Sequence, residues 1–123
     1  AGGEHRIAHC WEEAAANSGD NRYLHGNYVG LGTLVMARLY ELAEQEEDLP
    51  PCDYMPSFAK IRFYLDKMKG YSSFETLQIT REALEESIRH AAESDARYTL
   101  LNYLKEKGRL EIYIERLSRE FFG

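Results

Sequence analysis

Residues 24–46 read LHGNYVGLGTLVMARLYELAEQE, a segment in which large apolar side chains recur at intervals of three, four and seven residues. The recurring side chains are Leu24, Tyr28, Leu31, Val35 and Leu42. This spacing places them on one face of an α-helix, where they can pack against a core. The sequence therefore predicts a long helix from about residue 21 to 46, with Asp20 as its N-cap.

The segments on either side show the same helical spacing. We expect a first helix from about Glu4 to Ala16, a third from Ser57 to Gly70, a fourth from the Thr80 cap to about Glu93, a fifth from Ser94 or Asp95 to about Lys107, and a sixth after Gly108. The predicted fold class is all-α: an irregular bundle of five or six helices around the long second helix. Residues 1–123 are expected to form a single helical domain, since a chain of this length has room for one core.

Two segments are also compatible with strands. Residues 74–79 and 109–115 could pair as a small two-stranded sheet, which gives a mostly α fold as the alternative. Helix is favoured for the second segment, because its apolar pattern continues through Leu117 and Phe121, beyond the length of a typical strand.

The net charge of −6 is unevenly distributed along the chain. Residues 1–55 carry a balance of −7, whereas residues 56–123 carry +1. An acidic first half attracts basic proteins and repels phosphate backbones, so nucleic acid is not an expected partner. The apolar stretch 24–43 is interrupted by polar and charged side chains, which argues against a membrane span. We expect a soluble protein and favour the cytoplasm over secretion, but the compartment stays open, because residues 1–3 lack the features of a signal peptide and a processed end would look the same.

Three polar residues near the start of the chain have a spacing compatible with metal binding. His5, His9 and Glu13 lie at i, i+4 and i+8, on one face of the predicted first helix. They could form half of a zinc or other transition-metal site, completed by His25 or His90. The simpler interpretation is a solvated polar face, because no HExxH motif or closely spaced cysteine pair accompanies them. On that interpretation no metal or other cofactor is expected.

Cys10 and Cys52 match neither a zinc-binding nor a CxxC pattern. They could form a disulfide or remain two small buried side chains, and the second interpretation is favoured.

The glycines between Gly26 and Gly32 do not fit a phosphate-binding loop, because no strand pattern precedes them and no GxGxxG or Gly-Lys-Ser/Thr motif is present. Instead, Gly26, Gly30 and Ala37 share one face of the second helix with Thr33. Such a stripe of small residues allows another helix to approach closely, either within the domain or in a homodimer.

Acidic and aromatic side chains suggest a binding surface. The acidic residues are Glu41, Glu44, Glu47 and Asp48, at the end of the second helix, where the helix dipole disfavours negative charge. Tyr54 and Phe122 are the expected exposed aromatic anchors. With no nucleophilic arrangement legible, these features predict a non-catalytic protein-binding module, such as an inhibitor, an immunity-type neutraliser or a complex subunit, with a basic protein as partner.

Two alternatives to this function remain. Residues 100–117, LLNYLKEKGRLEIYIERL, resemble the closing helix pair of bacterial effector-associated, death-fold-like adaptor domains. The resemblance implies homotypic docking by a self-associating adaptor. The other alternative is a metal-dependent enzyme that uses His5, His9 and Glu13.

Overall fold

The computed structural model describes residues 3–19, 25–50, 57–67, 73–93 and 98–123. Within these ranges every regular element is a helix, which confirms the predicted all-α bundle. The helices are α1 (Glu4–Asn17), α2 (His25–Glu46), α3 (Phe58–Lys67), α4 (Arg81–Ala92), α5 (Leu100–Glu106) and α6 (Leu110–Phe122).

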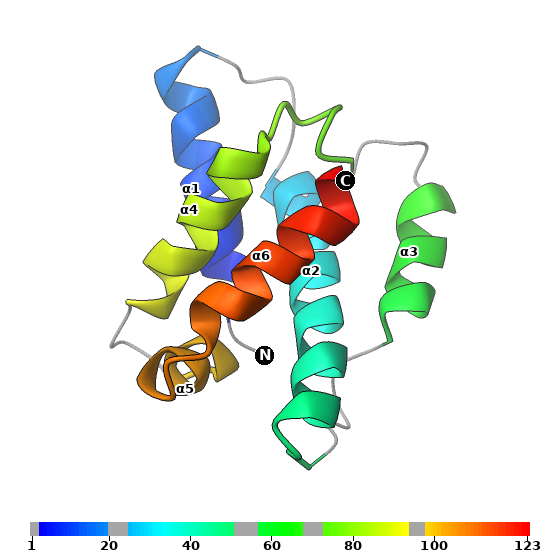
Figure 1. The fold of residues 1–123 in the computed structure, drawn as a ribbon. Coiled ribbons are helices and arrows are strands. Elements are labelled where there is room, and N and C mark those ends of the chain that lie inside the picture. The colour runs from blue at the N-terminus through cyan, green and yellow to red at the C-terminus, as the bar shows by residue number, and fades with distance from the viewer. Residues whose placement is uncertain (1–2, 20–24, 51–56, 68–72, 94–97) are drawn as a thin grey trace.

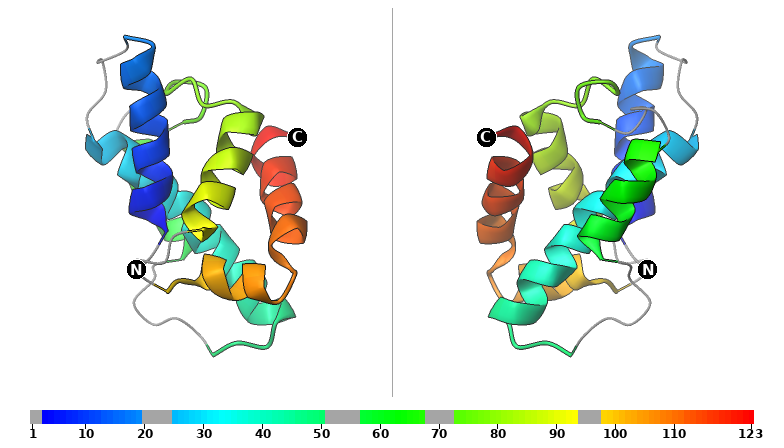
Figure 2. Two further views of the ribbon diagram at one scale, coloured as in Figure 1. Left: turned by 90° about the vertical axis from the view of Figure 1, so that its left-hand side faces the viewer. Right: turned by 90° about the vertical axis from the view of Figure 1, so that its right-hand side faces the viewer.

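Helix α2 forms the centre of the bundle (Figure 1). Helices α1, α4 and α6 stand side by side, with α1 and α6 packed against α2 and α4 packed against α1 and α6, and α3 packs on another side of α2 (Figure 2). The predicted seam of α2 is buried from Tyr28 to Leu42, and Leu34, Met36 and Leu39 are buried as well. Because neighbours cover α2 on several sides, its apolar surface is wider than a single helical stripe. None of the described helices combines the length and the apolar character needed to cross a membrane.

Two glycines of α2 lie where neighbouring helices come closest. A Cβ atom built on Gly32 would lie 2.8 Å from the main-chain oxygen of Glu4 in α1, and one built on Gly30 would lie 3.1 Å from Leu65 in α3. The same construction at Gly26 meets nothing within 4 Å. The close approach of α1 to α2 therefore depends on Gly32, which lies outside the predicted small-residue stripe.

The segment before α4 is a compact turn. Thr80 accepts a hydrogen bond from the Ala83 amide, as the sequence predicts for an N-cap. In residues 73–79 the Ile79 amide donates to the Phe74 carbonyl at 2.8 Å, and Ser73 Oγ accepts from the Thr76 amide. These local bonds close the turn on itself. The two-stranded alternative is wrong, because residues 74–79 make turns and residues 110–122 are helical.

The fifth helix begins later than the sequence analysis predicts. Helix α5 starts at Leu100, and Thr99 before it has extended backbone torsions. The Thr99 hydroxyl accepts from the Leu101 amide, and Asn102 Oδ1 accepts from the Thr99 amide at 2.8 Å. This reciprocal cap fixes the helix start at a position where spacing of apolar residues alone could not.

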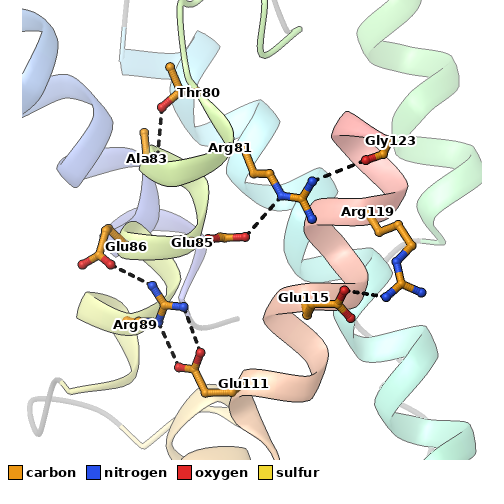
Figure 3. Close-up of polar contacts among 10 residues, drawn as sticks. All are labelled: Thr80, Arg81, Ala83, Glu85, Glu86, Arg89, Glu111, Glu115, Arg119 and Gly123. Atoms are coloured by element: carbon orange, nitrogen blue, oxygen red, sulfur yellow. Dashed lines mark hydrogen bonds and ion pairs between the residues drawn. The ribbon is translucent and has the colours of Figure 1, made fainter.

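Ion pairs join α4 to α6 along the surface (Figure 3). Arg89 donates to both carboxylate oxygens of Glu111, at 2.9 and 2.8 Å, and also to Glu86 within its own helix. Hydrogen bonding from Arg89 lowers the pKa of the Glu111 carboxyl. The pair is partly exposed, so its main effect is to set how the two helices align rather than to add much stability.

Candidate active site

Helices α1 and α2 bring two histidines together. The imidazole rings of His5, in the first turn of α1, and His25, the first residue of α2, are stacked with centroids 6.0 Å apart and planes inclined by 25°. Both side chains are exposed. The rings meet because α1 packs against the first half of α2. Gly32 has no side chain, so the main chain of α1 can approach α2 closely there. Histidine is a frequent acid–base group and metal ligand, so two exposed imidazoles in contact make this a candidate site.

A carboxylate from α1 completes this cluster. Glu12 Oε1 lies 2.6 Å from His25 Nδ1, and the side chains are 24% and 60% exposed respectively. A carboxylate in its ionised form only accepts hydrogen bonds, and with such a partner the contact requires a proton on His25 Nδ1. We call His5, Glu12 and His25 the histidine cluster.

The predicted metal triad is not assembled as such. His9 and Glu13 form their own ion pair on the exposed face of α1, at 3.4 Å, and His90 lies on the exposed surface of α4. Among the described residues, no group of three or more His, Cys, Asp or Glu side chains is arranged to hold a metal ion. His25, which the sequence analysis considered only as a completing ligand, lies instead against His5 and Glu12.

Glu4, next to the cluster in sequence, was missed by sequence reasoning. Its side chain is buried, with 6% exposure, and its Oε2 atom has no hydrogen-bond partner within the part of the chain that the structure describes. A carboxylate in the first turn of a helix normally complements the helix dipole from the surface, so the sequence carries no signal of this burial.

Two of the predicted partner-binding acids make contacts inside the protein. Glu41 accepts from the Phe58 amide at 2.9 Å, which ties the start of α3 to α2. Glu47 Oε2 accepts from the Tyr113 hydroxyl at 2.7 Å and from Arg109 Nε at 2.9 Å. Glu44 is half-buried, and Asp48 is exposed with a positive φ of 55°. The hydrogen bonds that Glu41 and Glu47 make give these acids a structural role at the end of α2.

The contact between Glu47 and Tyr113 makes stability depend on pH. Hydrogen bonds from Tyr113 and then Arg109 lower the pKa of the Glu47 carboxyl in the folded state. A depressed folded-state pKa stabilises the protein above the unfolded value, roughly 4.3, and this stabilisation is lost as pH falls through the folded pKa. We expect Tyr113→Phe to lower the free energy of unfolding at pH 7, and the difference from wild type to shrink steadily below about pH 4.3, as denaturant titrations at several pH values would measure.

Tyr98 offers a matched control for that measurement. Its hydroxyl also donates to a carboxylate, that of Glu106, at 3.1 Å, but the side chain of Tyr98 is 62% exposed. Tyr98→Phe should therefore change stability little at any pH. Equal, pH-independent losses in the two variants would contradict the role given to Glu47.

The predicted aromatic anchors are only partly described. Phe122 is half-buried, and its ring lies 5.0 Å from the ring of Phe74, so it packs on the core instead of standing free as an anchor. Tyr54, like Cys52, lies outside the described residues. The large aromatics that are exposed are Phe63 and Tyr64 on α3, and Tyr98 before α5. Cys10 is a half-buried free thiol, and its burial raises its pKa.

Comparison with known proteins gives three similar sequences. The chain is 25% identical over 119 residues to a protein of Bacillus licheniformis, 28% over 122 residues to one of Bacillus velezensis, and 26% over 127 residues to one of Halalkalibacterium halodurans. All three are named glycerol-1-phosphate dehydrogenase (NAD(P)+). The similarity is to an enzyme.

The match covers most of this chain but only part of each dehydrogenase. It covers 89%, 89% and 86% of this chain, but only 30%, 31% and 32% of the three dehydrogenases, so the chain spans about a third of their length. The uncovered part of this chain is too short to reach His25 from either end, so His25 lies within the similar segment. No family model matches the chain, and no solved structure does.

These relatives overturn the predicted function. Similarity to dehydrogenases indicates part of an enzyme, not a non-catalytic protein-binding module. The prediction failed because acidic runs and surface tyrosines are compatible with many kinds of protein, and Glu41 and Glu47 are explained by contacts within the chain. The resemblance of residues 100–117 to adaptor domains finds no support in the comparisons, since the three similar sequences are all named as dehydrogenases.

Proposed function

We propose that this chain is the helical part of a dehydrogenase that oxidises a phosphorylated polyol with a nicotinamide nucleotide, as the names of its relatives describe. The observation that carries the proposal is the agreement of three relatives, all named for one reaction, over at least 86% of the chain. Because the chain spans about a third of each relative, we propose that it works as one part of a longer polypeptide.

The described residues do not fit a site for the nicotinamide nucleotide. Dinucleotides are commonly bound where a strand leads through a glycine-rich turn into a helix. Here the glycines Gly26, Gly30 and Gly32 all lie inside α2, and the described part of the chain is helical with connecting turns. In this proposal the nucleotide is therefore held by residues other than those that the structure describes here.

The histidine cluster supplies the chemistry that this chain can contribute. An alcohol must lose the proton of its hydroxyl group when it is oxidised. An imidazole nitrogen that carries a lone pair, on His5 or His25, can take up that proton, or can hold a divalent cation that makes the hydroxyl more acidic. Their exposure, with 60% of the His25 side chain open to solvent, leaves them accessible to a substrate.

The test is an activity measurement on the complete polypeptide that carries this chain in its native source. Purified protein supplied with divalent cations should reduce NAD+ or NADP+ in the presence of glycerol 1-phosphate, followed by the absorbance of the reduced nucleotide. His25→Asn should lower the turnover roughly 10²- to 10⁴-fold, the range over which a positioned acid–base group contributes.

His90→Asn is the matched control, because it removes an exposed imidazole that lies on α4 and is not a member of the histidine cluster. This variant should keep wild-type activity. The proposal is ruled out if folded protein, as judged by circular dichroism, reduces neither NAD+ nor NADP+ with glycerol 1-phosphate or with its mirror-image isomer.

A further inference from the structure

The shortest polar contact in the histidine cluster joins Glu12 to His25. Glu12 Oε1 lies 2.6 Å from His25 Nδ1, slightly shorter than the roughly 2.7 to 2.9 Å of charge-assisted N–H···O hydrogen bonds. We propose that Glu12 is a positioning residue, which fixes the tautomer and the orientation of His25 so that Nε2 is the nitrogen that reacts. Its consequence for catalysis rests on the dehydrogenase function proposed above, whereas the tautomer itself does not.

The contact is set by the fold rather than by a chance meeting of surface side chains. Glu12 lies in the third turn of α1, and its carboxylate is 24% exposed, so it is partly withdrawn from solvent. Helix α2 begins at His25, directly beside it. The spacing between these helices is fixed by the close approach of Gly32 to the Glu4 main chain.

A second contact restrains the same imidazole from another direction. Glu12 holds one edge of the His25 ring, while the His5 ring lies against its face at a centroid distance of 6.0 Å. Edge and face together define the plane and direction of the ring. The opposite edge, which carries Nε2, is left for substrate or cation.

The tautomer follows from the chemistry of the partner. A carboxylate accepts hydrogen bonds and cannot donate them when ionised, so it selects the tautomer with the proton on Nδ1. The lone pair then resides on Nε2. A carboxylate behind a histidine also makes the far nitrogen a better base and a better ligand.

The neighbouring pair of His9 and Glu13 shows what a less constrained contact looks like. Its separation is 3.4 Å, and the two side chains are 72% and 66% exposed. Both residues belong to α1, one turn apart, and solvent screens their interaction. Proximity of a carboxylate to a histidine therefore does not by itself distinguish Glu12. What distinguishes Glu12 is its shorter distance to the histidine, its lower exposure and the fact that its partner lies on a second helix.

Nuclear magnetic resonance tests the tautomer directly on this chain. Nitrogen-15 shifts of imidazoles, recorded at a pH where they are neutral, distinguish a proton on Nδ1 from one on Nε2. We expect His25 to be the Nδ1–H tautomer in wild type and to shift towards the Nε2–H form in Glu12→Gln. Glu106→Gln also removes one carboxylate, but this one ends α5 and accepts from Tyr98. It should leave the tautomer of His25 unchanged.

Activity of the complete polypeptide tests the consequence. Glu12→Gln should lower kcat roughly 10- to 100-fold, the usual effect of removing a carboxylate behind a functional histidine, with KM for the nucleotide unchanged. Glu12→Asp, which keeps the charge, should recover part of the loss. Both variants must give a wild-type circular dichroism spectrum.

The outcomes separate this inference from the proposed function. A wild-type His25 that carries its proton on Nε2, or a Glu12→Gln variant with an unaltered tautomer and full kcat, would overturn the role of Glu12 while leaving a dehydrogenase possible. Absence of dehydrogenase activity from the wild-type protein would refute the function, and the spectra would still decide whether Glu12 selects the tautomer.

Discussion

Replacing Trp11 with alanine is expected to lower the free energy of unfolding by about 3 to 5 kcal/mol, the cost of removing a large buried aromatic side chain. Trp11 is 4% exposed in α1, and its ring meets the edge of Phe74 at a centroid distance of 6.1 Å. The cavity would open where α1, α4 and the turn before α4 meet. Denaturant titration followed by circular dichroism measures the loss.

A comparison with phenylalanine separates volume from hydrogen bonding at this position. The Trp11 Nε1 atom is buried, and none of the described residues offers it a hydrogen-bond partner. Trp11→Phe therefore gives up no polar contact, and it relieves a buried donor that costs about 1 to 3 kcal/mol when left unsatisfied. We expect Trp11→Phe to retain most of the wild-type stability. A loss as large as that of Trp11→Ala would contradict this account.

Replacing Gly32 with alanine is expected to destabilise the fold by about 1 to 3 kcal/mol, although alanine is the better helix former by about 1 kcal/mol. The new Cβ would lie 2.8 Å from the main-chain oxygen of Glu4, and a backbone atom cannot move aside as a flexible side chain can. Helix α1 must therefore shift. Since α1 carries His5 and Glu12, the same variant should also weaken the histidine cluster, measurable as a shift of the His25 nitrogen resonances.

Gly26→Ala is the matched control for that experiment. It introduces the same methyl group into the same helix, but a Cβ at Gly26 meets nothing within 4 Å. Its stability should be unchanged or raised, by up to about 1 kcal/mol. If both variants lose stability equally, the close approach of α1 at Gly32 is not what distinguishes them.

The fold could be predicted from sequence to the extent that it follows local rules. The seam from Tyr28 to Leu42, the Thr80 cap and the length of the apolar pattern after Gly108 each depend on neighbouring residues alone, and each prediction is confirmed. The start of α5 was placed too early, because Thr99 and Asn102 form a reciprocal cap that competes with a continuous helix. The close approach at Gly32 could not be predicted, since it depends on which helix packs there.

The candidate site was predicted only in part. Helical spacing correctly places His5 and His9 on the exposed face of α1, but it could not show that His25 would stack on His5 or that Glu12 would bond to it. Both contacts join residues on different helices. The enzymatic character of the relatives was also beyond the reach of composition, because the features that stood out, such as the acids near residue 47, are largely engaged within the fold.

Helix α3 differs from the other helices in how it is held. It packs chiefly on α2, through Ile61 and Leu65, while Phe63 and Tyr64 face solvent. Detaching it would break its packing on α2 and the contact of Phe58 with Phe121 of α6, but would leave α1 and α6 packed on α2 and α4 packed on α1 and α6. Among the described helices, α3 should therefore have the lowest free energy of local opening. Its amide protons should exchange with deuterium by opening of α3 alone, without unfolding of the whole chain.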